Sequence, residues 1–246
     1  MTKAVAIIPA RFDSTRFPGK ALADKTGKPL IQHVYEQVRQ AECVGEVIVA
    51  TDDPRILEAV SGFGGQAVLT RRDHPNGTSR IAEVAESLDD EIIVNIQGDE
   101  VEIEPALIDL AVRTLQEQRD CPVSTLASPF AADEDPSDPN LVKVVLDHRG
   151  RALYFSRALI PHLHEKWGGE TYSPPLKHVG MYVYCRPFLA EYVSLPATPL
   201  ERTERLEQLR VLEHGYPMAV AVGEAHFHGI DTPEQYEEFV RRYAAR

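Results

Sequence analysis

Residues Ala4–Lys20 read AVAIIPARFDSTRFPGK and join an unbroken apolar run to a basic loop that contains Pro and Gly. The run Ala4–Pro9 shows no polar alternation, which predicts a strand covered on both faces. The loop carries Arg11, Arg16 and Lys20 in a chain whose formal net charge is -12 at pH 7. A basic cluster directly after a buried strand of an acidic protein indicates a local site for a small anion.

The amino-terminal part of the chain alternates apolar strand patterns with helical patterns. Further strands are expected at Val47–Ala50, Gln66–Leu69 and Glu91–Ile96, and helices at Leu30–Ala41, Arg55–Val60, Arg80–Leu88 and from Pro105 onward. This alternation predicts an α/β fold with a doubly wound, mostly parallel sheet. We expect one domain over residues 1–246.

The pattern changes in the second part of the chain. We expect strands at Val142–Asp147, Ala152–Ser156 and His178–Cys185, which would form a smaller mixed β lobe over about residues 140–190. The segment 160–177 is rich in Pro and Gly and holds the only Trp, Trp167, so we expect a surface excursion. Later elements are predicted as a helix at Glu201–Gly215, a strand at Met218–Val222 and a final helix capped by Thr232.

Composition and charge exclude several classes of protein. The sequence pI of about 5.2 argues against general binding of nucleic acid or an anionic membrane surface, because both need a broad basic face. No window has the roughly 18 apolar residues of a membrane-spanning helix. Three scattered cysteines, Cys43, Cys121 and Cys185, suit neither a disulfide framework nor a CxxC metal site, so we expect a reduced, cytoplasmic location.

Polar clusters follow three of the predicted parallel strands. The basic loop follows the first strand, Asp52 and Asp53 follow the second, and Gln97, Gly98 and Asp99 follow the central one. Because ligands of open α/β sheets bind beyond the carboxyl ends of the strands, we expect these clusters to line one crevice. Arginine can hold phosphate oxygens through two bonds, so a triphosphate is the expected ligand.

Each cluster also has a simpler interpretation. A short basic loop fits a solvated surface turn when taken alone, and so does the segment His74–Thr78, in which Asn76–Thr78 is expected to form a turn and a helix cap. Asp99 is more informative, because an acidic residue at the end of an apolar strand is costly to bury without a cation. Asp231 fits a helix cap as well as a functional role.

Eight segments in chain order resemble a known enzyme family. They are IPARFDSTRFPGK, HPNGTSR, NIQGDE, NPNLVKVVLD, ALYFSRALIP, KHVGMYVY, LERTERLEQLRVLEHG and GIDTPE. Together they resemble the 3-deoxy-manno-octulosonate cytidylyltransferases, also called CMP-Kdo synthetases, in which CTP reacts with the sugar acid Kdo to give CMP-Kdo and pyrophosphate for lipopolysaccharide synthesis. The resemblance covers nearly the whole chain.

The resemblance implies a role for each matching residue. The nucleotide would be held by Arg11, Ser14, Arg16, Lys20, Asn76, Gly77, Arg80 and Gln97. The sugar acid would be held by Arg157, His178, Tyr182, Glu207 and Gln208. Catalysis would depend on Lys20, Arg16, Asp99 and Asp231, with both aspartates as ligands of Mg²⁺, which prefers oxygen donors. Considered alone, His178 also fits a buried strand histidine, and the LEQLRVL helix fits an amphipathic packing element.

The resemblance further implies a mechanism and an assembly. The anomeric hydroxyl of the sugar acid would attack the α-phosphorus of CTP and pyrophosphate would leave, so no covalent nucleophile is needed. A homodimer formed through the smaller lobe is also implied.

Three positions depart from the family pattern and keep the identity of the sugar open. Ala21 and Val101 stand where proline is usual, and Ser79 stands where an acidic residue is usual. A related sugar acid therefore remains an alternative, whether an 8-amino variant of Kdo, another ulosonic acid or sialic acid. From other classes, a glycosyltransferase would use Asp99 to hold a nucleotide-sugar, but would not need the Lys20 loop, and a nucleotide sensor would leave the acidic pair idle.

Overall fold

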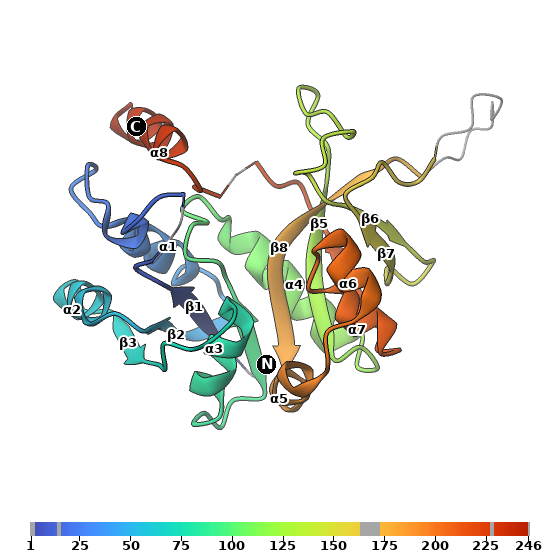
Figure 1. The fold of residues 1–246 in the computed structure, drawn as a ribbon, viewed down its shortest axis with the longest axis horizontal. Coiled ribbons are helices and arrows are strands. Elements are labelled where there is room, and N and C mark those ends of the chain that lie inside the picture. The colour runs from blue at the N-terminus through green and yellow to red at the C-terminus, as the bar shows by residue number, and fades with distance from the viewer. Residues whose placement is uncertain (1–2, 14–15, 163–172, 227–228, 246) are drawn as a thin grey trace.

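The computed structural model describes residues 3–13, 16–162, 173–226 and 229–245. Its centre is a nine-stranded sheet in the order β3-β2-β1-β4-β8-β5-β9, with the β6–β7 hairpin attached through β8 (Figure 1). The strands are β1 Ala4–Ala10, β2 Val44–Thr51, β3 Gln66–Leu69, β4 Ile92–Asn95, β5 Val123–Pro129, β6 Lys143–Leu146, β7 Ala152–Ser156, β8 Leu176–Cys185 and β9 Met218–Val222.

The strand directions agree with the predicted doubly wound sheet. The strands β3, β2, β1 and β4 are parallel neighbours, and β5 is parallel to β9. The long strand β8 lies between β4 and β5 and is antiparallel to both. The main sheet is therefore mostly parallel with one reversed central strand, which confirms the predicted fold class.

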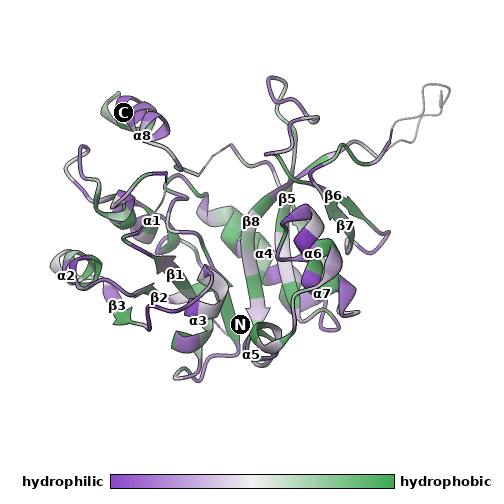
Figure 2. Cartoon of the chain, viewed as in Figure 1, coloured by the Kyte–Doolittle hydropathy of each residue, from purple (hydrophilic) through white to green (hydrophobic). Residues whose placement is uncertain are grey.

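Helices cover both faces of this sheet. They are η1, a 3₁₀ turn, Lys20–Leu22, α1 Leu30–Val38, α2 Pro54–Gly62, α3 Gly77–Ala85, α4 Pro105–Glu117, α5 Arg186–Ser194, α6 Pro199–Glu204, α7 Leu209–Glu213 and α8 Pro233–Ala244. The side chains of α1, α2, α4 and α8 join one apolar core, and those of α3, α5 and α7 join the other. Figure 2 shows hydrophobic stretches in green within the sheet and mixed green and purple colouring on the helices around it.

The first strand explains why two cores are needed. Along β1, Ala4, Ala6 and Ile8 belong to one core, whereas Val5 and Ile7 belong to the other. Successive side chains of a strand point to opposite faces, so a strand with apolar residues at every position must be covered on both sides. The unbroken apolar run Ala4–Pro9 thus specifies a central strand.

The predicted helix caps are present. Asn76 accepts a hydrogen bond from the Ser79 amide at the start of α3, as the turn before this helix predicted. Thr232 caps α8 in a capping box, with Pro233 at the first helical position. Side chains of this kind satisfy amide groups that have no partner within the helix.

The single helix predicted over Glu201–Gly215 is wrong, because the structure has two short helices, α6 and α7, there. They are separated by Arg205, which has a φ of 53° in the left-handed region. The carbonyl groups of Glu204 and Arg205 accept hydrogen bonds from the Arg157 side chain instead of continuing a helix. A tertiary contact therefore overrides a strongly helical local sequence.

Three elements, β5, α5 and the 3₁₀ turn η1, have no counterpart among the predicted ones. The strand β5 lacks an apolar run because it contains Ser124 and Thr125, both fully buried. Their hydroxyl groups donate to the carbonyl oxygens of Ala111 and Met181, which allows polar residues in the core.

The region 140–190 contains the β6–β7 hairpin and β8. The hairpin pairs with β8 only at Leu176 and Lys177, while the remainder of β8 runs through the main sheet. Trp167 and residues 163–172 of the expected surface excursion lie outside the described residues. No helix in the described part of the chain is long and apolar enough to cross a membrane.

Candidate active site

A pocket of about 340 Å³ lies beyond the carboxyl ends of β1 and β4, at the start of α3. It is lined by Pro9, Ala10, Arg11, Asp13, Lys20, Ala21, Gly77, Gln97, Gly98 and Asp99. The first and third predicted polar clusters therefore share one crevice, where parallel sheets usually bind ligands. Of the nucleotide contacts implied by the resemblance, Arg11, Lys20, Gly77 and Gln97 line this pocket.

Two glycines let separate loops approach the end of β1. A Cβ atom on Gly98 would lie 2.9 Å from the backbone oxygen of Pro9, and one on Gly77 would lie 3.0 Å from the Pro9 ring. The loops after β4 and before α3 thus pack against Pro9 at a distance that larger residues would prevent. This close packing forms the floor of the pocket.

Lys20 joins three distant parts of the chain at the edge of the pocket. Its ammonium nitrogen lies 2.7 Å from Asp99 Oδ2 and 3.3 Å from Asp231 Oδ1, and it donates to the Ile230 carbonyl oxygen at 2.8 Å. Arg16, whose side chain is 66% exposed, lies 2.9 Å from the same Asp231 oxygen. All four residues predicted to be catalytic therefore meet at one point.

Glu100 adds a third carboxyl group behind this cluster. The residue is half-buried, and its Oε2 atom is buried without a hydrogen-bond partner among the described residues. Burial, together with the charges of Asp99 and Asp231, raises the pKa of Glu100 to about 8, and Lys20 only partly opposes this rise. Glu100 is therefore mostly protonated at neutral pH, and the charged carboxylates of the cluster are those of Asp99 and Asp231.

Two carboxylates directed at one point suit a hard cation, with one restriction. In the described residues, no group of three or more His, Cys, Asp or Glu side chains is arranged to hold a metal ion. Asp99 and Asp231 do, however, direct carboxylate oxygens at the same ammonium group. Mg²⁺ commonly takes one or two carboxylates and completes its coordination with water and substrate phosphates, so these two residues fit the ion.

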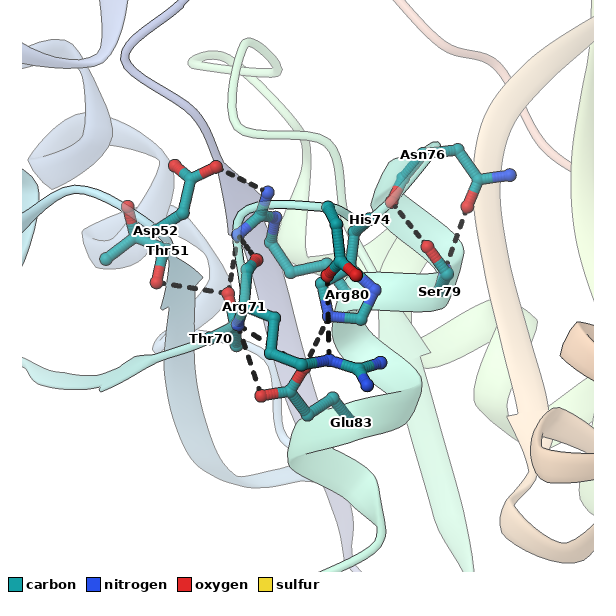
Figure 3. Close-up of polar contacts among 10 residues, drawn as sticks. Thr51, Asp52, Thr70, Arg71, His74, Asn76, Ser79, Arg80 and Glu83 are labelled. Atoms are coloured by element: carbon teal, nitrogen blue, oxygen red, sulfur yellow. Dashed lines mark hydrogen bonds and ion pairs between the residues drawn. The ribbon is translucent and has the colours of Figure 1, made fainter.

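Arg80 is placed differently from the pocket residues. It is fully buried, and its guanidinium group donates to Asp52 Oδ2 at 2.8 Å and to the Thr70 hydroxyl (Figure 3). It also donates to the Arg71 carbonyl oxygen at 3.3 Å. Arg80 thus ties the start of α3 to the ends of β2 and β3, and Asp52 of the second polar cluster serves this tie.

A second part of this network lies beside Arg80. Figure 3 shows Glu83 between the His74 ring and the Arg71 side chain, and the three are joined by hydrogen bonds. Asn76 and Ser79 bond to each other through two contacts in the first turn of α3. The segment HPNGTSR is therefore an ordered loop with many internal contacts.

The residues predicted to contact the sugar acid lie on the α3 and α7 side of the sheet. Burial raises the pKa of Glu207, and hydrogen bonds to Asn76 and Thr78 partly oppose this rise. Gln208 is buried at the start of α7. The α6–α7 break that disrupts the predicted helix thus directs Glu207 toward α3.

His178 and Tyr182 lie on β8 with their rings 5.6 Å apart. The Thr125 hydroxyl is 2.9 Å from His178 Nε2, and burial lowers the pKa of this histidine to about 3. Burial also raises the pKa of Tyr182 well above its usual value, with a smaller effect from Glu207. Both side chains are therefore uncharged at neutral pH.

Arg157 anchors two loops through its guanidinium group. It donates to the carbonyl oxygens of Glu204 at 2.8 Å and Pro139 at 2.9 Å, and weakly to that of Arg205. A guanidinium has five N–H donors, so two remain beyond these three contacts. Ser14, the remaining implied nucleotide contact, lies outside the described residues.

Several site residues were missed by the sequence interpretation. The Ile230 carbonyl oxygen bonds Lys20, and no side-chain pattern can signal a backbone acceptor. Glu204 accepts from Ser156 Oγ at 2.7 Å and from the Arg157 amide at 3.0 Å, which organises the end of β7. Asp13 lines the pocket, and its place within the basic loop was an available signal.

Comparison with known proteins identifies the family to which this chain belongs. The profile of the cytidylyltransferase family matches residues 5–221. A 3-deoxy-manno-octulosonate cytidylyltransferase of Geobacter sulfurreducens is 51% identical over 96% of this chain and 98% of its own length. The enzyme of the same name from Geotalea uraniireducens is 50% identical over 98% of each chain.

Solved structures extend the comparison to three dimensions. A CMP:2-keto-3-deoxy-manno-octonic acid synthetase complexed with CTP superimposes with a TM-score of 0.92 at 43% identity over 99% of both chains. An inositol-1-phosphate CTP transferase of T. maritima, 12% identical over 99% of this chain and 97% of its own, has a TM-score of 0.67 and shows the shared fold alone. This chain belongs to the 3-deoxy-manno-octulosonate cytidylyltransferase family.

Proposed function

We propose that this protein transfers a cytidylyl group from CTP to 3-deoxy-D-manno-octulosonate, giving CMP-Kdo and pyrophosphate for lipopolysaccharide synthesis, and that it requires Mg²⁺. The observation that carries the proposal is the meeting of Lys20 and Arg16 with Asp99 and Asp231 at the edge of the pocket. Basic donors for a triphosphate and carboxylates for its counterion belong together in nucleotidyl transfer. Relatives of this name at about half identity support the choice of substrates.

The residues have separate tasks in this reaction. Arg11, Arg16 and Lys20 bind the triphosphate oxygens, and Lys20 and Arg16 stabilise the charge that develops on the departing pyrophosphate. Asp99 and Asp231 hold Mg²⁺, which when bound offsets phosphate charge and helps orient the attacking hydroxyl group. The acceptor contacts on β8 and α7 place the anomeric hydroxyl in line with the α-phosphorus.

Lys20 lies close to the place of this task. Its side chain is 16% exposed at the edge of the pocket, and its ammonium group contacts the carboxylates of Asp99 and Asp231. Once these carboxylates hold Mg²⁺, the ammonium group is released from those contacts to the triphosphate oxygens. The histidine at position 178 is buried, and its Nε2 atom lies 2.9 Å from the Thr125 hydroxyl, so it serves to shape the site.

The three departures from the family pattern lie in different surroundings. Ala21 and Val101 are buried, so they fill space beside the pocket without changing its charge. Ser79 bonds to Asn76 in the first turn of α3, close to the proposed nucleotide half of the site. A related sugar acid is therefore the second candidate, because replacement of an acidic residue at position 79 alters local charge.

The test is a pyrophosphate-release assay with CTP, Mg²⁺ and a panel of sugar acids. We expect release that requires Mg²⁺ and is fastest with Kdo. Faster turnover of an 8-amino variant, another ulosonic acid or sialic acid would favour the second candidate. Release of a nucleoside diphosphate from a nucleotide-sugar, with no pyrophosphate from any sugar acid, would favour a glycosyltransferase instead.

We further propose a cytoplasmic homodimer that forms through the β lobe. In the described part of the chain, β7 pairs only with β6, and the side chains of Leu153 and Leu159 are exposed nearby. An open strand edge with apolar side chains is a common site of association between chains. Light scattering after size-exclusion chromatography measures the mass of the protein, and Leu153→Asp should shift a dimer toward the monomer.

The proposed cytoplasmic location is a separate point. The three free cysteines suit a reducing compartment, which cell fractionation would check.

A further inference from the structure

Asn95 is a polar residue at the carboxyl end of β4. It is fully buried, with 0% of its surface exposed, and it lies two residues before Gln97 of the pocket. In the sheet it stands opposite Ile7 on β1 and Tyr182 on β8. Directly opposite residues of paired strands share a face, so the Asn95 side chain lies on the α3 and α7 side.

The side-chain amide of Asn95 lacks the partners that a buried amide needs. Neither Oδ1 nor Nδ2 forms a hydrogen bond with any residue that the structure describes. Burial without hydrogen bonds is costly, and the great majority of buried side-chain amides are satisfied. An apolar residue of similar shape would serve the core better, so the amide calls for a functional explanation.

The surroundings of Asn95 supply that explanation. Tyr182 stands directly opposite Asn95 on β8, and its ring lies 5.6 Å from the ring of His178. Both of these β8 residues are among the acceptor contacts that the family resemblance implies. Two implied acceptor contacts therefore lie on the same face of the sheet as an amide that has none of its bonds made.

We propose that Asn95 is a specificity-determining residue at the floor of the acceptor subsite, where its amide hydrogen bonds a hydroxyl group of the sugar acid. The inference rests on the proposed function, since it assigns a contact to the acceptor of that reaction. A hydroxyl group can donate to Oδ1 and accept from Nδ2, which matches the inventory of the amide. The amide is fully buried, so acceptor binding must displace the residues that cover it.

This arrangement makes the amide selective. A site with a buried amide loses affinity for an acceptor that lacks the matching hydroxyl group, because the amide is then left unpaired. The same unpaired amide lowers the stability of the protein without acceptor. Stability and acceptor recognition therefore place opposite demands on position 95, and a single variant separates them.

The test compares wild type with Asn95→Leu, which has nearly the same shape and no polar atoms. We expect the melting temperature of the free variant to rise, its kcat/KM for Kdo to fall about tenfold or more, and its KM for CTP to stay within about twofold. Ile93→Leu, a fully buried apolar exchange on the same face of β4, is the control and should change neither constant. Asn95→Ser is a second variant in case the Asn95→Leu protein does not fold.

Acceptors that each lack one hydroxyl group complete the test. One of them should be a poorer substrate than Kdo for wild type but nearly equal to Kdo for the Asn95 variants. If wild type is active and both Asn95 variants keep its kcat/KM for Kdo, the role of Asn95 is overturned but the proposed function is not. The same holds if the variants lose kcat/KM equally for every acceptor. No pyrophosphate release by wild type from any sugar acid would overturn the proposed function and this inference together.

Discussion

The ammonium nitrogen of Lys20 lies 2.7 Å from a carboxylate oxygen of Asp99, which is 79 residues further along the chain. The pair is mostly buried, with 16% and 22% of the two side chains exposed. A charge held in a partly dry site acts more strongly than one in water, so this contact fixes a strong cation at the mouth of the pocket.

Replacing Lys20 should remove most of the activity. For Lys20→Met we expect kcat to fall by about 10²–10³, which is typical when one electrostatic contact to a transition state is lost. Steady-state pyrophosphate release measures this. Lys25→Met is the matched control, because Lys25 is an exposed lysine that bonds only Tyr236 and Glu237 in the described contacts. An equal loss in both variants would contradict a specific role for Lys20.

Asp231 should set the requirement for Mg²⁺. In Asp231→Asn we expect the Mg²⁺ concentration for half-maximal rate to rise about tenfold, because a neutral amide is a weaker ligand for a hard cation than a carboxylate. A titration of the rate with Mg²⁺ at saturating CTP measures this change. Glu237→Gln, an exposed carboxylate exchange on α8, is the control. An unaltered Mg²⁺ titration in Asp231→Asn would remove this residue from the metal site.

Gly98 should not tolerate a side chain. In Gly98→Ala the new Cβ atom would lie 2.9 Å from the Pro9 backbone oxygen, and relief of this clash should cost about 1–3 kcal/mol of unfolding free energy. The shifted loop should also weaken CTP binding. Urea unfolding and CTP titration measure the two effects. Gly62→Ala is the control, since its Cβ would meet nothing within 4 Å, and it should be neutral or slightly stabilising.

The buried pair of Arg80 and Asp52 should matter for folding. Arg80→Met leaves the carboxylate of Asp52 without its partner, and breaking a buried pair costs about 3–5 kcal/mol. The exposed pair of Arg113 and Glu42 provides the comparison, and Arg113→Met should cost at most about 1 kcal/mol. Chemical denaturation measures both values. A loss of activity in Arg80→Met at full stability would instead favour direct contact with the nucleotide.

His178 should make stability depend on pH in the acidic range. Burial lowers its pKa from 6.5 to about 3 in the folded protein, so between these values the unfolded chain binds a proton that the folded chain does not. The free energy of unfolding contributed by this group is therefore complete above pH 6.5 and falls as the pH drops toward 3, by about 1.4 kcal/mol per pH unit.

Two variants isolate this effect. His178→Gln should flatten the dependence of stability on pH between 6.5 and 4, as measured by urea unfolding at several pH values. His148→Gln, an exposed exchange in the β6–β7 turn, should leave the curve unchanged. A wild-type curve identical to that of His178→Gln would show that the histidine titrates normally in the folded state.

Strong local patterns made much of the fold predictable. The apolar run of β1 and the caps Asn76 and Thr232 each depend on neighbouring residues alone, and each appears in the structure. The strand β5 was not predictable in this way, because its Ser124 and Thr125 are buried through bonds to residues outside the strand. The break at Arg205 likewise depends on the distant Arg157.

The candidate site shows the same division. The basic loop and the acidic end of β4 were identifiable because charged residues follow directly after an apolar strand. The tie between Arg80 and Asp52, and the unsatisfied amide of Asn95, were not identifiable, because neither residue has an unusual local context.

The sequence by itself determined the central strand, the α/β class and the residue types of an anion site, because these follow from local hydrophobic periodicity and charge. Only the tertiary structure decided that Asp99 and Asp231 face the same ammonium group of Lys20, and that the Asn95 amide is fully buried without a hydrogen-bond partner among the described residues. The physical reason is that convergence of side chains depends on how strands order themselves in the sheet. That order results from packing between segments far apart in the chain, which no local pattern encodes.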